Sequence, residues 1–203
     1  MQCLKSYLQL KLYTNDVKIT PLGIEGVWLV QSPVFRDERG LFREWFRSEA
    51  SEELTGKQFR VAQANVSLSS KGTLRGIHFS IAPEGQAKLV TCITGAIQDV
   101  IVDIRTNSPT FGQWIDLELA SESGDAIFIS EGLGHAFLAL QDKTALAYLV
   151  STAYSPVHEF GINPFDKKIA IRWHSEQASL TISDRDLTAP TLSELEELGK
   201  LPK

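Results

Sequence analysis

Apolar and polar residues alternate over many short stretches of this chain, and turn-forming residues separate the stretches. Alternation at residues 27–30, 114–119 and 145–151 is typical of strands that are buried on one face. Residues 96–104 are almost continuously apolar and β-branched, which predicts a strand buried on both faces. About ten such strands, with turns between them, favour an all-β fold, a two-sheet barrel of the jelly-roll type. The other predicted strands are residues 41–46, 59–67, 74–80, 126–129 and 169–173.

Two short helices are predicted beside the barrel. Ser48 is suited to cap a helix over residues 49–55, which has glutamates in its first turn and Gly56 at its end. The tail at residues 193–198 predicts a second helix, ending at Gly199.

A chain of 203 residues is long enough for one domain with a full core. Residues 1–20 alternate only weakly, so we expect an N-terminal extension, either an extra edge strand or an appendage docked on a partner chain. Residues 21–203 are predicted to form a single domain.

The formal net charge of −5, without a basic stripe, argues against binding to nucleic acid. Cys3 and Cys92 are too few for a disulfide framework, which favours a reducing compartment. No segment has the pattern of a signal peptide or a membrane span. We therefore expect a cytoplasmic protein with no membrane partner.

The strongest chemical signal lies at residues 72–90. Strict alternation along the strand predicted there would place His78 and Arg75 on opposite faces. Lys88, on the following strand, can lie beside His78, and an imidazole next to an ammonium is costly to bury. A lone strand histidine is more often a hydrogen-bonded structural residue, so the pair indicates chemistry only together with other signals.

A second polar pattern lies on the strand predicted at residues 59–67. Gln63, Asn65 and Ser67 are spaced two apart and therefore share a face. Such a face either meets solvent or lines a barrel lumen that binds a polar ligand. Both interpretations stay open on this pattern alone.

One interpretation of the barrel is a metal-dependent cupin, an oxygenase or isomerase. The residues at the spacings of the cupin metal motif are Gly72, His78, Glu84, Gly132 and His135. Ser80 stands where that motif has its second histidine, and Ser130 stands where it has proline. Because a hydroxyl is a poor ligand for a transition metal, the set is short of strong ligands, and we expect no metal.

The other interpretation rests on a resemblance that extends from about residue 27 to residue 190. The motifs that carry it are Phe35-Arg36-Asp37-Glu38-Arg39-Gly40, Gln63-Ala64-Asn65, Leu74-Arg75-Gly76-Ile77-His78, Lys88-Leu89-Val90, Asp99-Val100, Val102-Asp103-Ile104-Arg105, Ser108-Pro109-Thr110-Phe111-Gly112-Gln113-Trp114, Gly132 with His135, Tyr148, Tyr154-Ser155-Pro156, Glu159, and Ser183 with Asp186. With these motifs the chain resembles the dTDP-4-dehydrorhamnose 3,5-epimerase family and its relatives, the dTDP-4-keto-6-deoxyhexose 3-epimerases of deoxysugar pathways. This resemblance implies a cupin-type jelly-roll barrel with short flanking helices, and a cofactor-free epimerase.

The resemblance also implies a role for individual residues. The catalytic set is a base at His78, an aspartate at Asp186 that holds it, Lys88 at the enolate and Tyr148 as the proton donor on the opposite face of the sugar. Asp184, close to Asp186, is an alternative partner of the histidine. The substrate implied is a dTDP-linked 4-keto-6-deoxy sugar, and the assembly a homodimer. Residues at substrate-binding positions are Arg39, Phe42, Glu44, Gln63, Asn65, Arg75, His135, Tyr154 and Glu159.

Three departures from the rhamnose enzymes concern the stereochemistry. They are Ser80, Ser130-Glu131-Gly132, and the segment at residues 161–166. They look more like the 3-epimerases, so inversion of C3 is expected and inversion of C5 stays open. A catalytically silent sugar-nucleotide binder is a further alternative, against which the intact catalytic set argues.

Overall fold

The computed structural model describes residues 17–48, 59–83 and 85–203. The helix predicted at 49–55, residue Glu84 and the first 16 residues of the predicted extension lie outside the described residues. The strands are β1 (Lys18–Pro21), β2 (Val27–Gln31), β3 (Val34–Asp37), β4 (Gly40–Arg43), β5 (Gln63–Ser69), β6 (Leu74–Ser80), β7 (Lys88–Thr94), β8 (Ala96–Asp103), β9 (Trp114–Ala120), β10 (Asp125–Ile129), β11 (Leu133–Ala139), β12 (Thr144–Val150) and β13 (Glu159–Gly161). The helices are η1 (Gln177–Ser179), α3 (Asp184–Leu187) and α4 (Leu192–Glu197).

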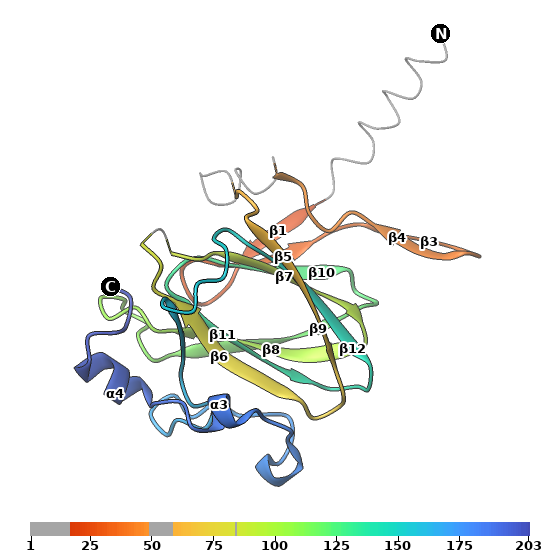
Figure 1. The fold of residues 1–203 in the computed structure, drawn as a ribbon. Helices are drawn as coiled ribbons and strands as arrows, with labels where there is room; N and C mark the ends of the chain where they lie inside the picture. Colours follow the sequence, from red (N-terminus) through yellow and green to blue (C-terminus); the bar gives the residue numbers. More distant parts are fainter. Residues whose placement is uncertain (1–16, 49–58, 84) are drawn as a thin grey trace.

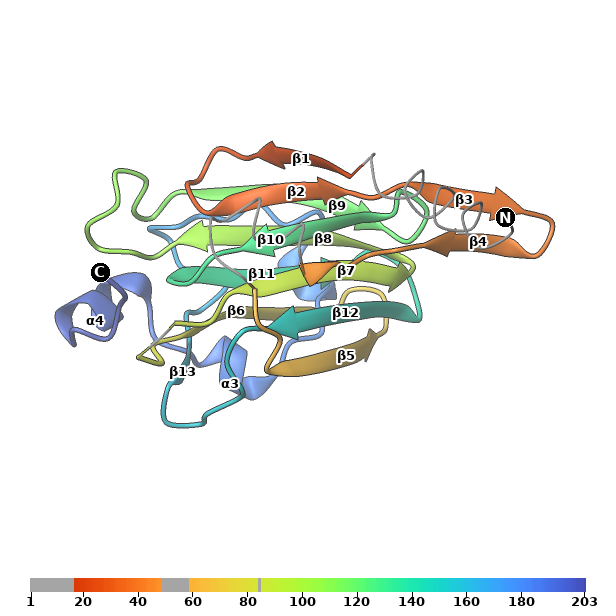
Figure 2. The ribbon, with the colours of Figure 1, turned by 90° about the horizontal axis from the view of Figure 1, so that it is seen from above.

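Two antiparallel sheets lie face to face (Figures 1 and 2). The six-stranded sheet has the order β1-β2-β10-β7-β12-β5, and the five-stranded sheet has the order β13-β6-β11-β8-β9. Strands β3 and β4 pair with each other in a hairpin that extends away from both sheets (Figure 1). The predicted all-β, two-sheet barrel of the jelly-roll type is confirmed.

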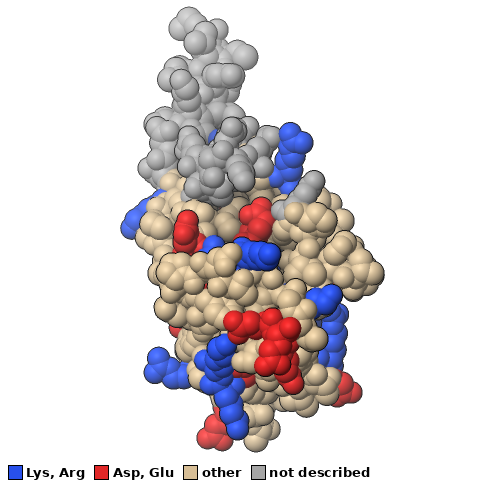
Figure 3. All heavy atoms as spheres, turned by 90° about the vertical axis from the view of Figure 1, so that its left-hand side faces the viewer, with Lys and Arg blue, Asp and Glu red and all other residues tan. Residues whose placement is uncertain are grey.

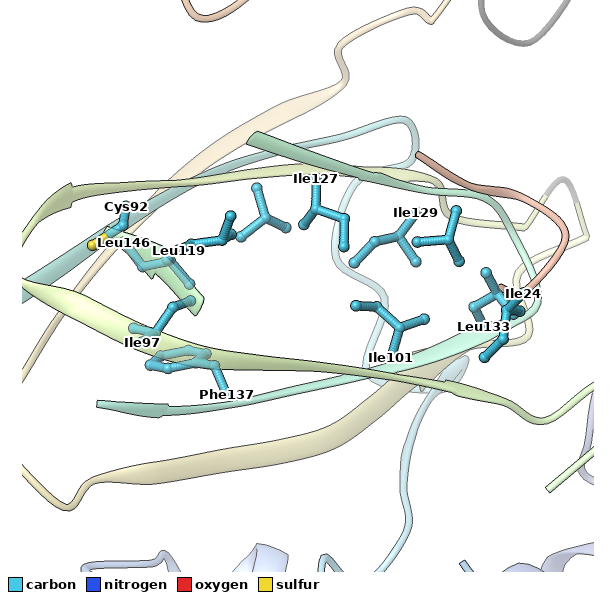
Figure 4. Packing of buried hydrophobic residues seen from close by; sticks show 12 residues of the cluster. Ile24, Cys92, Ile97, Ile101, Leu119, Ile127, Ile129, Leu133, Phe137 and Leu146 are labelled. Atoms are coloured by element: carbon cyan, nitrogen blue, oxygen red, sulfur yellow. The ribbon is translucent and has the colours of Figure 1, made fainter. Parts of the chain in front are cut away.

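Strand β8 shows why the sheets pack as they do, because all eight of its residues are buried. Ile97 and Ile101 point into the space between the sheets, where they face Ile127 of β10 (Figure 4). Val100 alternates with them and packs on the opposite side, in a cluster that includes Leu192 of α4. A strand covered on both faces needs apolar residues on both, which explains the continuous apolar run in its sequence.

The strand predicted at residues 169–173 is wrong. Two of its backbone groups bond to side chains, and the N–H of Ala170 donates to the Asp166 carbonyl at 2.8 Å, so no ladder with a neighbouring strand forms. Asp166 Oδ1 accepts from the backbone N–H of Ile169 at 3.0 Å, while Gln98 Nε2 donates to the carbonyl of Arg172 at 2.9 Å. Gln98 Oε1 also accepts from the backbone N–H of His174 at 2.9 Å. Two buried polar side chains thus take the hydrogen bonds that a strand ladder would need.

Several element ends also differ from the prediction. The strand predicted at 59–67 begins only at Gln63, and the one predicted at 41–46 ends at Arg43 as the second strand of the hairpin. The last helix begins at Leu192 because Thr191 and Glu194 form a capping box. Within the predicted N-terminal extension, the described part forms edge strand β1, which pairs with β2.

The charged residues on the face that carries α4 are mixed in sign, with acidic and basic side chains next to one another (Figure 3). Within the described ranges, no helix has the length and apolar character needed to cross a membrane.

Asp103 at the end of β8 is a buried carboxylate that organises the following turn. It accepts hydrogen bonds from Arg105 Nη2 at 2.7 Å, from Ser108 Oγ at 2.6 Å and from Thr110 Oγ1 at 2.6 Å. Burial alone would raise the pKa of Asp103, but these hydrogen bonds outweigh it and lower the pKa to about 2. The folded state therefore favours the ionised form of Asp103, and ionisation of this carboxylate stabilises the fold.

Replacing this carboxylate tests its contribution to stability. Since its folded pKa lies below the ordinary 3.8, the contribution is present above about pH 4 and is lost as the pH falls toward 2. We expect Asp103→Asn to lower the free energy of unfolding by about 2 kcal/mol at pH 7. We also expect the difference from wild type to shrink toward pH 2, as measured by urea unfolding. Asp142→Asn at an exposed turn is the control, and an equal loss in both variants would contradict the prediction.

Candidate active site

A cavity of about 660 Å³ opens between the sheets, lined by β5, β6, β11, β12 and the segment that leads into α3. A smaller pocket of about 170 Å³ adjoins it. His78, Lys88, Tyr148 and Arg185 line both. The catalytic candidates of the sequence therefore meet in one connected space.

His78 is held by Asp186, as the resemblance implied. His78 Nε2 lies 2.7 Å from Asp186 Oδ1, and Asp186 as a whole residue is 5% exposed. Asp186 Oδ2 accepts from the backbone N–H of Gly76 at 3.3 Å, and Ser183 caps α3 by accepting from the Asp186 N–H. Burial alone would raise the pKa of Asp186, but the hydrogen bonds from His78 and Gly76 outweigh it and lower this pKa. Asp184, the alternative partner, lies exposed at the start of α3.

The alternation predicted for β6 fails at its centre. His78 and Arg75 were expected on opposite faces, but both line the large cavity. The register with β11 pairs His78 with His135 and Arg75 with Phe137, so β6 carries one extra residue between them. Gly76, with φ +115°, lies within this irregularity, in a backbone region that favours glycine. The bulge turns a guanidinium and an imidazole toward the same ligand space.

Lys88 reaches the site from the opposite sheet. As predicted, it lies beside His78: its Nζ is 3.5 Å from the His78 carbonyl oxygen. The residue is only 8% exposed, and burial lowers its pKa, an effect that the charges of Glu159 and Asp99 oppose.

Tyr148 lies on β12, across the cavity from β6. Its backbone pairs with Asn65 on one side and with Val90 on the other. Burial raises the pKa of Tyr148 above 10, with the charge of Arg75 opposing the shift. The phenol is thus protonated at neutral pH and can donate a proton.

The polar face of β5 points into the barrel, which decides between the two interpretations of that strand. Gln63, Asn65 and Ser67 are half-buried, whereas Val66 and Leu68 between and beyond them are exposed. Gln63 Nε2 donates to Asn65 Oδ1 at 2.7 Å, which fixes both amides at the smaller pocket.

Two further predicted ligand contacts, Tyr154 and Glu159, also line the smaller pocket. Gln63 Oε1 accepts from the backbone N–H of Tyr154 at 2.9 Å. Gln86 Nε2 donates to Glu159 Oε1 at 3.3 Å. His135 lines the large cavity, and its Nε2 lies 2.6 Å from Asp99 Oδ1.

Three predicted substrate-binding residues do not line this cavity. Arg39 and Phe42 lie on the β3–β4 hairpin, where Arg39 pairs with Asp37 and Phe42 is 67% exposed. Glu44 follows the hairpin and pairs with Arg47. Within a single chain the structure thus separates these residues from His78.

Sequence reasoning missed two charged residues near the site. Arg185 lines both the cavity and the adjoining pocket, and Asp99 bonds to His135 from within the core. The sequence contained one indication that Arg185 lies at the site, because this residue directly precedes the predicted catalytic residue Asp186. For Asp99 the signal was the motif Asp99-Val100, which is part of the resemblance, and the charge of Asp99 within an otherwise apolar run.

Of the donor set of the cupin interpretation, Glu84 lies outside the described residues. The described residues contain no group of three or more His, Cys, Asp or Glu side chains suited to a metal ion. Both histidines bond to carboxylates through Nε2, while Ser80 Oγ accepts from the backbone N–H of Ala82.

Comparison with known proteins gives a consistent result. The profile of the dTDP-4-dehydrorhamnose 3,5-epimerase family matches residues 21–194. A dTDP-4-dehydrorhamnose 3,5-epimerase of Mycolicibacterium smegmatis is 50% identical over 182 residues, covering 89% of each chain.

Solved structures agree with this match. A 4-keto-6-deoxy sugar epimerase from the novobiocin gene cluster of Streptomyces spheroides is similar with a TM-score of 0.89 and 43% identity, covering 93% of this chain and 94% of its own. A 3'-monoepimerase from Streptomyces bikiniensis, in complex with dTDP-quinovose, is similar with a TM-score of 0.86 and 45% identity, covering 90% and 92%.

The bulge at Gly76 gives a test of how the site is built. A Cβ at Gly76 would lie 2.6 Å from both the His135 carbonyl oxygen and Ala136 Cβ, and φ would be strained. We expect Gly76→Ala to lower the free energy of unfolding by about 3 kcal/mol, measured by chemical denaturation. Gly40→Ala is the matched control, because its φ is +126° but its Cβ would meet nothing within 4 Å. If both variants lost the same free energy of unfolding, the positive φ alone would explain the loss at Gly76. The close approach of β6 to β11 would then contribute nothing, which would contradict the prediction.

Proposed function

Because this chain belongs to the dTDP-4-dehydrorhamnose 3,5-epimerase family, we propose that His78 and Tyr148 carry out its proton transfers from opposite faces of the sugar. The protein is an isomerase that epimerises a dTDP-linked 4-keto-6-deoxyhexose. C3 is the carbon we propose it inverts. The observation that carries the proposal is that an Asp-bonded imidazole, a buried ammonium and a neutral phenol line one cavity.

His78 is suited to remove the proton from C3. Its Nε2 is engaged by Asp186, which leaves Nδ1 as the nitrogen free to accept a proton. The C–H bond next to a ketone is weakly acidic, so the base must be held in position, and the carboxylate fixes the ring. The proton moves from C3 to His78, and the bonding electrons move to the O4 oxygen as an enolate.

Lys88 is suited to stabilise that enolate. Its ammonium is buried in the cavity, where a charge interacts more strongly than in water. Tyr148 then donates its phenolic proton to C3 from the other face, which inverts the carbon. The raised pKa of Tyr148 supports this direction of transfer, because the phenol keeps its proton at neutral pH.

The tested reaction is exchange with solvent deuterium in D2O, using dTDP-4-keto-6-deoxyglucose as the substrate. We expect the wild type to incorporate deuterium at C3 with inversion, and His78→Asn to slow exchange about a thousand-fold. Tyr148→Phe should still exchange the C3 proton but return it to the same face, so that the configuration is kept. Asp184→Asn, on the exposed side of α3, serves as the control.

NMR of the recovered sugar measures both label and configuration. Deuterium at C5 as well would extend the reaction to 3,5-epimerisation. Wild-type protein that leaves both carbons unlabelled would contradict the proposed function.

We also propose that the protein is a homodimer in which the β3–β4 hairpin completes the partner's cavity. The hairpin extends from the barrel (Figure 2) and exposes Phe42, while the outer face of the six-stranded sheet exposes Val66 and Ile93 at 72% and 49%. Exposed apolar side chains on a sheet and a projecting arm fit a second copy of the chain. Arg39 at the tip of the hairpin can then bind the diphosphate of a substrate in the other barrel.

Mixed dimers test this arrangement. In dimers of His78→Asn with Arg39→Ala chains, one of the two sites combines an intact barrel with an intact hairpin. Random mixing should therefore restore about a quarter of wild-type activity at low substrate concentration. Mixing His78→Asn with Tyr148→Phe should restore none, because both changes lie in the barrel. Equal behaviour of the two mixtures, or a monomer by light scattering, would contradict the arrangement.

A further inference from the structure

Asp99 is a buried carboxylate that the reaction described above does not use. It lies on β8 between Ile97 and Ile101, on the face that meets the core between the sheets, and it is fully buried. Its Oδ1 accepts from His135 Nε2 at 2.6 Å. Its Oδ2 is buried without a hydrogen-bond partner among the described residues. Such an unpaired oxygen is costly in a core, so packing alone gives no reason for it.

The nearby cation that this oxygen can serve is Lys88. Lys88 enters the same space from the opposite sheet, and its nearest polar contact is the His78 carbonyl oxygen at 3.5 Å. A neutral carbonyl does not balance a buried ammonium. The negative charges that act on Lys88 are those of Glu159 and Asp99, and both favour its protonated form against the effect of burial.

We propose that Asp99 is a positioning residue that orients His135 through Oδ1 and serves through Oδ2 as the counter-charge that keeps Lys88 an ammonium. The proposal rests on the proposed function, since it explains how the enolate-stabilising cation stays charged although Lys88 is buried. One carboxylate then links a predicted substrate contact on β11 with the cation on β7. Its position inside an apolar strand is consistent with a role beneath the site.

The other groups that face this space decide the sign of the expected effect. They are Arg75 and His78 on β6, His135 on β11, Tyr148 on β12, Glu159 on β13, and Arg185 and Asp186 on α3. Glu159 and Asp186 are the carboxylates of this set, and both already have partners: Gln86 donates to Glu159, and Asp186 bonds to His78 and to the backbone N–H of Gly76. Removing the charge of Asp99 therefore weakens the protonated state of Lys88, and activity should be lost at a lower pH than in wild type.

The experiment is the pH profile of deuterium exchange at C3 in wild type and Asp99→Asn. We expect the alkaline limb to move down by about one pH unit in Asp99→Asn. Asp103→Asn is the matched control: it lies on the same strand and is equally buried, but it pairs with Arg105. Asp103→Asn should lower the free energy of unfolding but leave the alkaline limb of the pH profile at its wild-type position. Lys88→Arg tests whether the alkaline limb reports the deprotonation of residue 88. A guanidinium stays charged at higher pH than an ammonium, so the limb should move to higher pH in this variant.

Each result has a defined meaning. A limb that stays in place in Asp99→Asn, even with lower activity at every pH, would overturn the proposal. A limb that is unchanged in Lys88→Arg would assign it to Tyr148 and would overturn the proposal as well. Wild-type protein without exchange would instead refute the proposed function.

A measurement on the wild type applies if Asp99→Asn does not fold. Long-range proton–nitrogen correlation spectra report which ring nitrogen of His135 carries the proton, with His135→Gln used for assignment. A proton on Nε2 supports the proposal, and a proton on Nδ1 alone would overturn it.

Discussion

The hydrogen bond between His78 Nε2 and Asp186 Oδ1 is the contact on which the rest of the site depends. It joins residues 108 positions apart, and backbone pairing fixes both sides. Leu74 donates to the Thr181 carbonyl and Thr181 donates to the Gly72 carbonyl, each at 2.9 Å, which ties the segment before α3 to the start of β6. The carboxylate therefore arrives beside the imidazole as a consequence of the fold, and it determines which ring nitrogen is left for a substrate.

The same cavity also shows how a core and a reactive site share one barrel. Between the sheets, Ile127 and Ile129 of β10 belong to the same apolar cluster as Ile101 of β8 (Figure 4). Ionisable side chains gather beside this cluster, where β6, β7, β11 and β12 line the cavity. Two His–carboxylate pairs lie next to each other there, since His78 and His135 are direct partners across β6 and β11. Burying these groups is costly, so their concentration in one place is a mark of function.

Much of the barrel could be predicted because hydrophobic patterns report burial. The strand that became β8 was identified from its apolar, β-branched run, and β6 from a run that mixes β-branched, glycine and ionisable residues. The resemblance supplied Asp186 as the partner of His78. Alternation failed at Gly76 because a bulge depends on the neighbouring strand. The strand predicted at 169–173 failed because side chains take part of its hydrogen bonding, Asp166 from the preceding turn and Gln98 from a strand distant in sequence. Whether Asp184 or Asp186 meets His78 depends on how α3 is set against β6, which local sequence does not encode.

The central claim is that His78 and Tyr148 meet a sugar ring from opposite sides. A crystal structure of this protein with bound dTDP-quinovose, the ligand named for the related 3'-monoepimerase, measures this directly. The account predicts the hexose ring between the two side chains, with His78 Nδ1 and the Tyr148 oxygen within about 4 Å of C3 on opposite faces. Both groups on one face of the ring, or a ring bound away from His78, would contradict it.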